Sequence, residues 1–334
     1  MHTYHNCLPK HGLPSIILQY QFLVKPDFII IGAMKSGTTT LHEVLEQHPD
    51  VYMPRGEMKF FSIDDFEQQH YFFPYHKGQW TDHDFRKKFE LYKKWYIDSY
   101  ANAGNAKVIG EDAPSYLPSK RAPERIAEQF PDIKLIISLR DPVSRLYSQY
   151  WHNVNNFGAY FTLEETLRYH PGLYFDRSCY KRQIENYLKW FPKEQMLFIL
   201  FEELILKPTN TIRAIEKFIG LPEFDYKYVH ANQGHFPKSL KLRLFRNRVL
   251  KSLHARHYYD VLPGMPRKPE LTLLQKFAFK AEKAINSAHN GRKPQMEDGT
   301  YTFLKNLLYR ENEGLEEIIG KDLREYWPTF QINS

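Results

Sequence analysis

A short loop near residue 35 gathers side chains that are suited to binding an anion. The apolar run Phe28–Ile31 ends at Gly32, and a polar loop follows it directly before a helical pattern. In such a strand–loop–helix turn, backbone N–H groups converge on one point and the helix dipole places its positive end there. A lysine adds charge, and hydroxyl groups add hydrogen-bond donors. We therefore predict a phosphate-binding loop that consists of Lys35, Ser36, Gly37, Thr38 and Thr39.

The order of residues in this loop differs from that of nucleoside triphosphatases. Their pattern, G-x-x-x-x-G-K-[ST], places a lysine directly after the second glycine. Here Gly32 and Gly37 keep the spacing, but Thr38 follows Gly37 and the lysine lies inside the loop at position 35. The difference favours a doubly anionic nucleotide other than a magnesium triphosphate. The alternative interpretation is an ordinary strand-to-helix turn.

A second polar cluster follows the apolar run Lys134–Leu139. Asp141 is a good N-cap residue and Pro142 suits the first position of a helix, so a helix should begin here. Arg140 would then lie at the end of the strand, with Ser148 two helical turns further on. A guanidinium group and a hydroxyl group in this arrangement can bind a second phosphate. The alternative is a surface arginine paired with a carboxylate.

The elements around these clusters predict an α/β fold. Short apolar segments alternate with longer helical ones, which favours a central, mainly parallel sheet flanked by helices in a P-loop-like, three-layer arrangement, followed by a helical C-terminal portion. Ligands of such sheets bind beyond the carboxyl ends of the strands. We expect strands at Phe28–Ile31, Lys107–Ile109, Lys134–Leu139 and Met196–Phe201, and helices at Gly37–Gln47, Asp82–Ala101, Ala122–Gln129, Pro142–Asn153 and Pro208–Ile219.

Composition limits the class of protein. The 334 residues are 42% hydrophobic and 25% charged, as in ordinary globular proteins, and the net charge of +7 favours anionic ligands without implying nucleic acid. Cys7 and Cys179 form no disulfide framework, and the apolar run Ile16–Val24 is too short to span a bilayer. We therefore expect a cytoplasmic protein.

At this point the chain resembles a known family. The segments GAMKSGTTTL and LRDPVSRLYSQY are similar to the two phosphate-binding motifs of sulfotransferases that use 3′-phosphoadenosine 5′-phosphosulfate (PAPS). The likeness is strongest to the carbohydrate branch, which includes heparan sulfate sulfotransferases and bacterial relatives, and it extends from residue 26 to residue 327. It implies an N-terminal extension at 1–25 and one sulfotransferase domain at 26–330, with 237–289 as a helical insertion or acceptor-side region.

The resemblance also implies roles for residues that bind the cofactor. Lys35 to Thr39 would hold the 5′-phosphosulfate, and Lys35 would stabilise charge on the leaving oxygen. Arg140 and Ser148 would bind the 3′-phosphate. A late basic loop would close over the cofactor, and it corresponds here to Gly291, Arg292 and Lys293. The product would be 3′,5′-bisphosphoadenosine, and the mechanism requires no metal.

The family places a general base in a Glu-x-[His/Lys]-Phe-Phe segment, which is Glu57 here with Lys59 two residues later. The reaction also requires a base, since sulfuryl transfer to a hydroxyl or an amine requires that a proton be removed from the acceptor. Lys59 would stabilise charge on the transferred group. Without the family context, the two residues are better explained as surface charges.

Three further residues are candidates for acceptor binding. Heparan-type enzymes carry a lysine after the Glu of the second-strand motif, whereas Glu111 is followed by Asp112. An acidic glycan is therefore in doubt as the acceptor, and Glu111 is either an acceptor-site carboxylate or a structural acid. Tyr180 is the third candidate, because it begins a segment that shares the family likeness.

The predicted reaction is sulfuryl transfer from PAPS to a hydroxyl, or less favourably an amine, of a carbohydrate or glycosylated acceptor. Three alternatives remain open. One is a sulfotransferase for a small lipid, phenol or natural-product hydroxyl, and another is a nucleotide-dependent kinase. The third is a non-catalytic binder of anionic glycans. The amphipathic basic stretch Lys238–His257 is either a helix packed on the core or a face for a polyanion or an acidic membrane. The sequence does not predict the oligomeric state.

Overall fold

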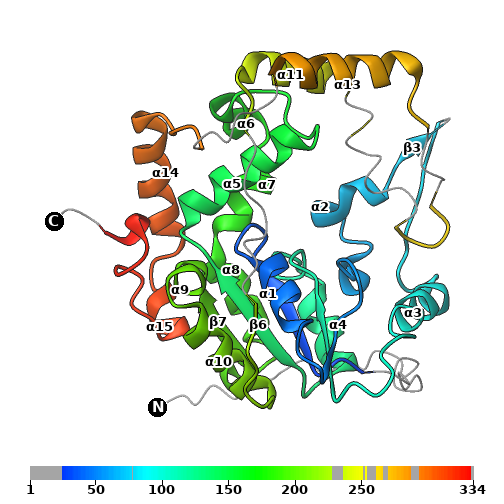
Figure 1. The fold of residues 1–334 in the computed structure, drawn as a ribbon, viewed down its shortest axis with the longest axis vertical. Coiled ribbons are helices and arrows are strands. Elements are labelled where there is room, and N and C mark those ends of the chain that lie inside the picture. Colours follow the sequence, from blue (N-terminus) through cyan, green and yellow to red (C-terminus); the bar gives the residue numbers. More distant parts are fainter. Residues whose placement is uncertain are drawn as a thin grey trace, which may run out of the picture.

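A five-stranded parallel sheet forms the centre of the molecule (Figure 1). The computed structural model describes residues 25–76, 78–227, 236–250, 253, 261–265, 270–286 and 293–331. Every neighbouring pair of strands in this sheet is parallel. The predicted central parallel sheet flanked by helices is therefore confirmed. Its order is β2-β5-β1-β6-β7, with β1 at Phe28–Gly32, β2 at Val51–Tyr52, β5 at Val108–Asp112, β6 at Lys134–Leu139 and β7 at Met196–Leu200.

The central strand β1 is buried on both faces, because helices cover the sheet from two sides. Successive side chains of a strand point to opposite faces. Phe28 and Ile30 pack with apolar residues of α1 (Thr38–Leu45) and α10 (Pro208–Ile219). On the other face, Ile29 and Ile31 join a larger core with residues of α4 (Ala122–Gln129), α8 (Tyr180–Tyr187) and α15 (Leu315–Ile319). This explains why the sequence of β1 is continuously apolar.

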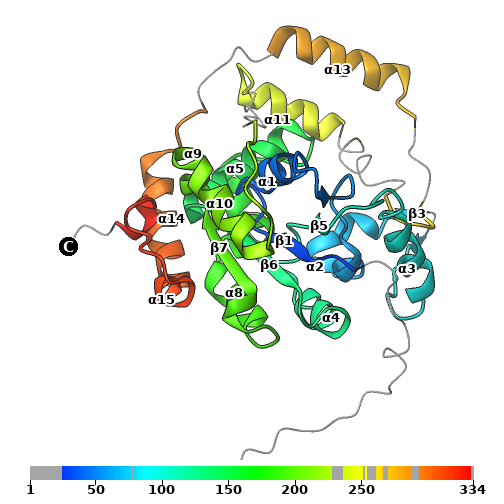
Figure 2. The same ribbon diagram turned by 60° about the horizontal axis from the view of Figure 1, so that its bottom comes forward.

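The remaining helices surround the carboxyl end of the sheet and its edges (Figures 1 and 2). A small antiparallel hairpin pairs β3 (Tyr75–His76) with β4 (Gln79–Trp80). Among the described residues, no helix is long and apolar enough to cross a bilayer. The helices not yet named are α2 (Phe66–Gln69), α3 (Phe89–Asp98), α5 (Pro142–Asn155), α6 (Leu163–Tyr169), α7 (Gly172–Phe175), α9 (Phe201–Leu206), α11 (Leu240–Val249), α13 (Leu273–Asn286) and α14 (Asp298–Glu311).

Most of the expected elements lie within about two residues of their predicted bounds, and the larger differences are as follows. The expected strand Lys107–Ile109 runs on to Asp112, so that two acids predicted to follow the strand belong to it. The charged helix expected at Asp82–Ala101 is confined to α3. The two-residue strand β2 is not predicted at all, because so short a segment carries no pattern. The predicted extension at 1–25 lies outside the described residues except for its last position.

Candidate active site

The loop between β1 and α1 is held in place by backbone contacts and close packing. Ser138 of β6 donates from its hydroxyl to the carbonyl oxygen of Ser36 at 2.6 Å. Gly37 is the N-cap of α1 and has a φ of 85°, which favours glycine. A Cβ atom there would also lie 2.9 Å from the ring of Phe201. The loop is therefore fixed at the carboxyl end of the sheet, and the N-terminus of α1 opens onto it.

The structure brings the two predicted phosphate motifs together. Arg140 follows β6 and donates from Nη1 to the carbonyl oxygen of Lys35 at 3.3 Å. Its guanidinium group lies 4.5 Å from the centroid of the Phe201 ring. Burial lowers the pKa of Lys35, and the positive charge of Arg140 lowers it further. Two cations held this close favour a bound anion between or beside them.

Helix α5 begins as the sequence predicts, with Asp141 as its N-cap. Its carboxylate accepts from the backbone N–H of Ser144 at 2.9 Å, and Pro142 is the first helical residue. The other carboxylate oxygen accepts from the backbone N–H of Thr329 at 3.0 Å. Ser148 is half-buried on this helix, two turns from Arg140. Its contact with a phosphate stays a prediction.

Of the predicted late basic loop, Lys293 is described, whereas Gly291 and Arg292 lie outside the described residues. The ammonium group of Lys293 lies 4.2 Å from the centroid of the Tyr147 ring. Burial, together with the charge of Arg140, lowers the pKa of Lys293 to about 7. Lys293 also lines a cavity of about 250 Å³ beside the first turns of α5. Lys293 is therefore electrostatically coupled to Arg140, its predicted partner in binding a phosphate.

Glu57 and Lys59 form an ion pair, with Lys59 Nζ 3.1 Å from Glu57 Oε2. The carboxylate side chain is 35% exposed, so an acceptor can reach it, whereas that of Lys59 is 12% exposed. Burial disfavours the charge of Lys59, but Glu57 outweighs this effect and the pKa of Lys59 is raised. The negative charge of Glu57 also acts to raise the pKa of Lys35. The predicted base is therefore close enough to interact electrostatically with both lysines.

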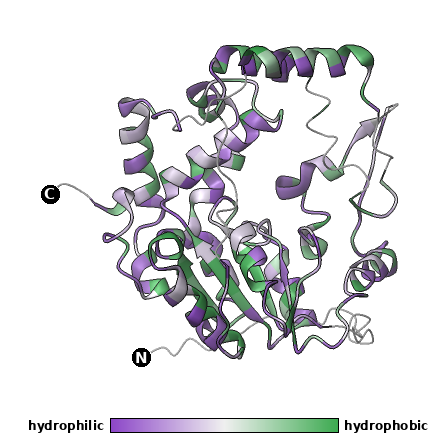
Figure 3. Cartoon of the chain, in the orientation of Figure 1, coloured by the Kyte–Doolittle hydropathy of each residue, from purple (hydrophilic) through white to green (hydrophobic). Residues whose placement is uncertain are grey.

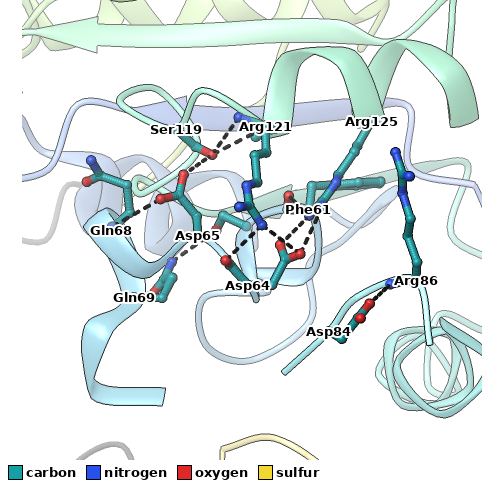
Figure 4. A network of polar contacts seen from close by, with 12 residues as sticks. Phe61, Asp64, Asp65, Gln68, Gln69, Asp84, Arg86, Ser119, Arg121 and Arg125 are labelled. Carbon is teal, nitrogen blue, oxygen red and sulfur yellow. Dashed lines mark hydrogen bonds and ion pairs between the residues drawn. The ribbon is translucent and has the colours of Figure 1, made fainter. Parts of the chain in front are cut away.

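A network of polar contacts fixes the segment that follows Glu57 and Lys59 (Figure 4). Arg125 of α4 binds both carboxylate oxygens of Asp64, at 2.7 and 3.1 Å, and Arg121 lies 2.7 Å from the same carboxylate. Asp65 caps α2 and accepts from the hydroxyl of Ser119 at 2.6 Å. These contacts tie the segment that follows Glu57 to α4 and to the turn before it.

The acceptor-site candidates Glu111 and Tyr180 are fully buried. Glu111 is fully buried and accepts from the hydroxyl groups of Tyr96, at 2.6 Å, and Tyr100. Tyr180 is fully buried and donates to the carbonyl oxygen of Arg140 at 2.9 Å. Of the two interpretations of Glu111, this geometry favours the structural acid. The acceptor-binding roles of both residues stay predictions.

Asp112, the departure from the family pattern, is paired with a histidine that the sequence does not single out. His42 Nδ1 lies 2.6 Å from Asp112 Oδ1, and the carboxylate is 8% exposed. Although burial opposes its charge, Asp112 raises the pKa of His42. The site therefore has a local ion pair where heparan-type enzymes carry a lysine.

Sequence reasoning also misses three residues in or near the predicted site. His152 of α5 lies against Lys35, with Nδ1 3.2 Å from Nζ. Arg177 is buried and donates to the side chain of Gln68 at 2.9 Å and to the sulfur of Met34, the neighbour of Lys35, at 2.6 Å. Arg145 is fully buried, burial lowers its pKa to about 10, and its charge lowers the pKa of Lys35. Nothing local marks these residues, since long-range packing places each of them near the site.

The site as a whole is rich in cations and poor in metal ligands. The charges of Arg140 and Arg145 act to lower the pKa of Lys35, and the charge of Arg177 acts to lower the pKa of Lys59. In the part of the chain that the structure describes, no group of three potential metal-binding side chains is present. Buried cations gathered in this way stabilise a bound polyanion.

Comparison with known proteins agrees with this geometry. The chain is 32% identical over 218 residues to mouse heparan sulfate glucosamine 3-O-sulfotransferase 3A1, which covers 63% of this chain and 49% of that protein. It is 28% identical over 269 residues to mouse heparan sulfate glucosamine 3-O-sulfotransferase 5, covering 75% of this chain and 68% of that protein. The chain thus spans about half the length of the first of these relatives.

The fold also has a solved counterpart. The crystal structure of a sulfotransferase from Alicyclobacillus acidocaldarius superposes with a TM-score of 0.59, at 24% identity, over 91% of this chain and 99% of that one. This likeness shows the shared fold. Residues 26–226, which include both phosphate motifs and the Glu57 segment, match the sulfotransferase family. The chain belongs to the sulfotransferase family.

Proposed function

We propose that the protein is a PAPS-dependent sulfotransferase that acts on a hydroxyl group of a carbohydrate or glycosylated acceptor. The observation that carries the proposal is the contact of Arg140 with the backbone of Lys35. It joins the two phosphate motifs at the carboxyl ends of the adjacent strands β1 and β6. PAPS carries two separate anionic groups on one nucleoside, and two adjacent cationic subsites suit such a ligand.

The residues present fit this cofactor. The N-terminus of α1 and Lys35 would hold the 5′-phosphosulfate, while Arg140, Ser148 and Lys293 would hold the 3′-phosphate. The lowered pKa values of Lys35 and Lys293 reflect cations that burial and like charge destabilise, and an anion would relieve both effects. When bound, PAPS supplies the sulfuryl group. Transfer forms an S–O bond to the acceptor and breaks the S–O bond to the phosphate, which leaves 3′,5′-bisphosphoadenosine.

Glu57 is the proposed general base. Its carboxylate would accept the proton of the acceptor hydroxyl as the new bond forms. The ion pair with Lys59 orients the carboxylate and keeps a second cation near the transferred group. Lys35 would stabilise the negative charge that develops on the leaving phosphate oxygen.

The relatives named above are called heparan sulfate glucosamine 3-O-sulfotransferases, which supports a sugar hydroxyl as the acceptor. Two features of the site bear on the acceptor. The partly exposed carboxylate of Glu57 can accept a proton from a hydroxyl or from an amine. Where the family resemblance predicts a lysine, this chain has Asp112 paired with His42, which favours an acceptor with fewer negative charges than heparan sulfate.

Calorimetry with 3′,5′-bisphosphoadenosine and ATP, each with and without Mg²⁺, tests the cofactor assignment. We expect metal-independent binding of the bisphosphate, and a loss of about tenfold to a hundredfold in affinity for Arg140→Ala. Arg310→Ala, which removes an exposed arginine from α14, is the matched control and should bind normally. Magnesium-dependent binding of ATP without binding of the bisphosphate would instead assign the protein to the kinases.

A further inference from the structure

Two helices form an arm that extends over one end of the molecule. We call α11 and α13 the helical arm, and both Figure 1 and Figure 2 show α13 standing away from the central sheet. Ion pairs link the two helices: Arg243 Nε and Arg246 Nη1 bind the carboxylate of Glu282 at 2.8 and 3.2 Å. Asn286 exchanges hydrogen bonds with the backbone of Ser239. These contacts join the two helices into one unit.

The arm is anchored beside the predicted active site. Asn247 is fully buried and donates to the carbonyl oxygens of Val154 and Ala159, at 2.9 and 2.8 Å. Arg243 donates to the side chain of Asn155 at 3.2 Å. Both Val154 and Asn155 belong to the last turn of α5, the helix whose His152 contacts Lys35. The arm therefore lies at the same end of the molecule as the phosphate-binding loop.

The outer side of α13 is apolar to a degree that is unusual for an exposed helix. Leu274, Phe277 and Ile285 are 77%, 71% and 69% exposed, and Leu273 before them is 84% exposed. The spacing of three and eight residues between Leu274, Phe277 and Ile285 places them on one stripe of the helix. Glu282, which is buried against α11, lies about a quarter of a turn round the helix from this stripe. The exposed fractions of the three side chains show that the stripe itself is open to solvent.

Helix α11 repeats this arrangement on a smaller scale. Phe245 and Val249 are 61% and 57% exposed, whereas Leu244 is buried against α5 and its neighbours. Figure 3 shows hydrophobic and hydrophilic residues interleaved along both helices of the arm. Exposed apolar patches of this kind mark sites of interaction.

In the sequence, positive charge is concentrated in the segment that contains these two helices. Residues 236–286 hold twelve lysines and arginines and three acids, a formal charge of +9, whereas the remaining 34 basic and 36 acidic residues give −2. Lys241 and Arg248 are exposed on α11, and Lys276 and Lys280 are exposed on the polar side of α13. The net charge of +7 for the whole chain therefore arises from this region alone.

We propose that the helical arm binds the surface of an anionic lipid bilayer, with its helices lying in the plane of the membrane. Apolar and aromatic residues flanked by lysines and arginines are the pattern of helices that insert at the level of the lipid headgroups. A sulfated glycan would satisfy the charges but has no apolar surface to cover the stripe. A second copy of this chain would bring the same positive charge to the interface. An anionic bilayer complements both properties.

Docking through the arm would also orient the enzyme. Because the arm is attached to the last turn of α5, the end of the sheet that carries the phosphate-binding loop would face the membrane side of the molecule. Membrane binding by the arm would place the enzyme at a bilayer surface whatever the identity of its acceptor.

Sedimentation with lipid vesicles tests the proposal. We expect the full-length protein to bind vesicles of phosphatidylcholine and phosphatidylserine, to bind pure phosphatidylcholine at least tenfold more weakly, and to lose binding as salt is added. Phe277→Ser should weaken binding about tenfold, and Lys276→Glu at least fivefold, since each basic residue near an anionic surface contributes to that extent. Both side chains are exposed, so the variants should fold normally.

Matched controls lie elsewhere on the surface. Phe303→Ser replaces a phenylalanine of α14 that is 61% exposed, and Lys217→Glu replaces an exposed lysine of α10. Equal losses for these controls, or equal binding to both kinds of vesicle, would overturn the proposal. The proposal would also be overturned if the protein bound heparin and only Lys276→Glu, not Phe277→Ser, weakened that binding. It would be overturned as well if the protein were a dimer that Phe277→Ser converts to a monomer. Activity toward a soluble acceptor should be unchanged in Phe277→Ser, which separates this result from the proposed function.

Discussion

The ammonium group of Lys35 lies 3.2 Å from Nδ1 of His152, a residue 117 positions later in the chain. The lysine donates this hydrogen bond, so the imidazole accepts at Nδ1 and carries its proton at Nε2. The carbonyl oxygen of Lys35 is bound by Arg140. Lys35 is thus held at its backbone by Arg140, which lies between β6 and α5, and at its side chain by a residue of α5. One strand-to-helix unit therefore positions both the backbone and the ammonium group of the residue proposed to stabilise the leaving group.

The first prediction concerns His152. His152→Leu should lower kcat about tenfold or more while changing the affinity for 3′,5′-bisphosphoadenosine little, because Lys35 loses the acceptor that positions its ammonium group. His152→Gln keeps an acceptor oxygen and should recover part of the rate. Steady-state kinetics with labelled PAPS, beside calorimetry, separates the two quantities. Equal rates for His152→Leu and the unchanged protein would contradict a positioning role.

The second prediction concerns the proposed base. Glu57→Gln should lower kcat by about a hundredfold to ten-thousandfold, the usual contribution of a general base, and should leave binding of the bisphosphate intact. The amide retains the shape of the side chain and can still accept from Lys59, so the segment should keep its position. Single-turnover measurements with saturating PAPS are the direct check. Undiminished turnover in this variant would remove Glu57 from the mechanism.

The third prediction concerns Lys293, whose pKa is lowered to about 7. A phosphate dianion should raise that pKa on binding, so the protein should take up a proton when it binds the bisphosphate. Affinity should be greatest below pH 7 and should fall with rising pH above it, by at most about tenfold per pH unit. Calorimetry in buffers of different ionisation enthalpy measures the proton uptake. Lys293→Arg keeps its charge throughout and should flatten the profile; a slope that persists in this variant would assign the effect to another group.

The fourth prediction concerns the stability of the fold. Burial in particular raises the pKa of Glu111 to about 7, from an ordinary value of 4.5. A raised pKa means that the folded state binds the proton more tightly, so this contribution to stability is complete below pH 4.5 and is lost as pH rises through 7. The loss amounts to about 3 kcal/mol at most.

Glu111→Gln provides the test, because the amide oxygen can still accept from Tyr96 or Tyr100 and carries no charge at any pH. The variant should lack this part of the pH dependence and should be more stable than the unchanged protein above pH 7. Thermal unfolding across the range from acid to neutral pH measures the difference. Parallel curves for the two proteins would show that Glu111 does not titrate in this range.

Much of the fold could be predicted because its signals are local. The helices Ala122–Gln129 and Pro208–Ile219 begin and end as expected, and the strand Lys134–Leu139 does so as well. Each is an apolar or amphipathic run with a proline or a turn at its boundary. Strand β5 is longer than the sequence predicts, because charged residues such as Glu111 and Asp112 usually end a buried strand. In the structure, tyrosines and a histidine form hydrogen bonds with these two carboxylates, so the strand continues through them.

The site could be predicted only where residues adjacent in sequence act together. The phosphate-binding loop and Arg140 meet as expected, since both follow strands of one parallel sheet. His152 and Arg177 could not be found in the same way. Their sequence surroundings are those of ordinary helical residues, and only the packing of α5 and of the segment before α8 brings them to Lys35 and Met34.

The hydrogen bond from the backbone of Thr329 to Asp141 spans 188 residues. Trp327 reinforces it by donating from its indole to the carboxylate of Glu202, at 3.0 Å. During translation, the strands and both phosphate motifs leave the ribosome well before these residues do. We expect a stalled nascent chain that ends before Trp327 to bind the bisphosphate more weakly than one extended past Thr329. The nucleotide site would then mature late in synthesis, and unfinished chains would leave the cellular pool of activated sulfate untouched.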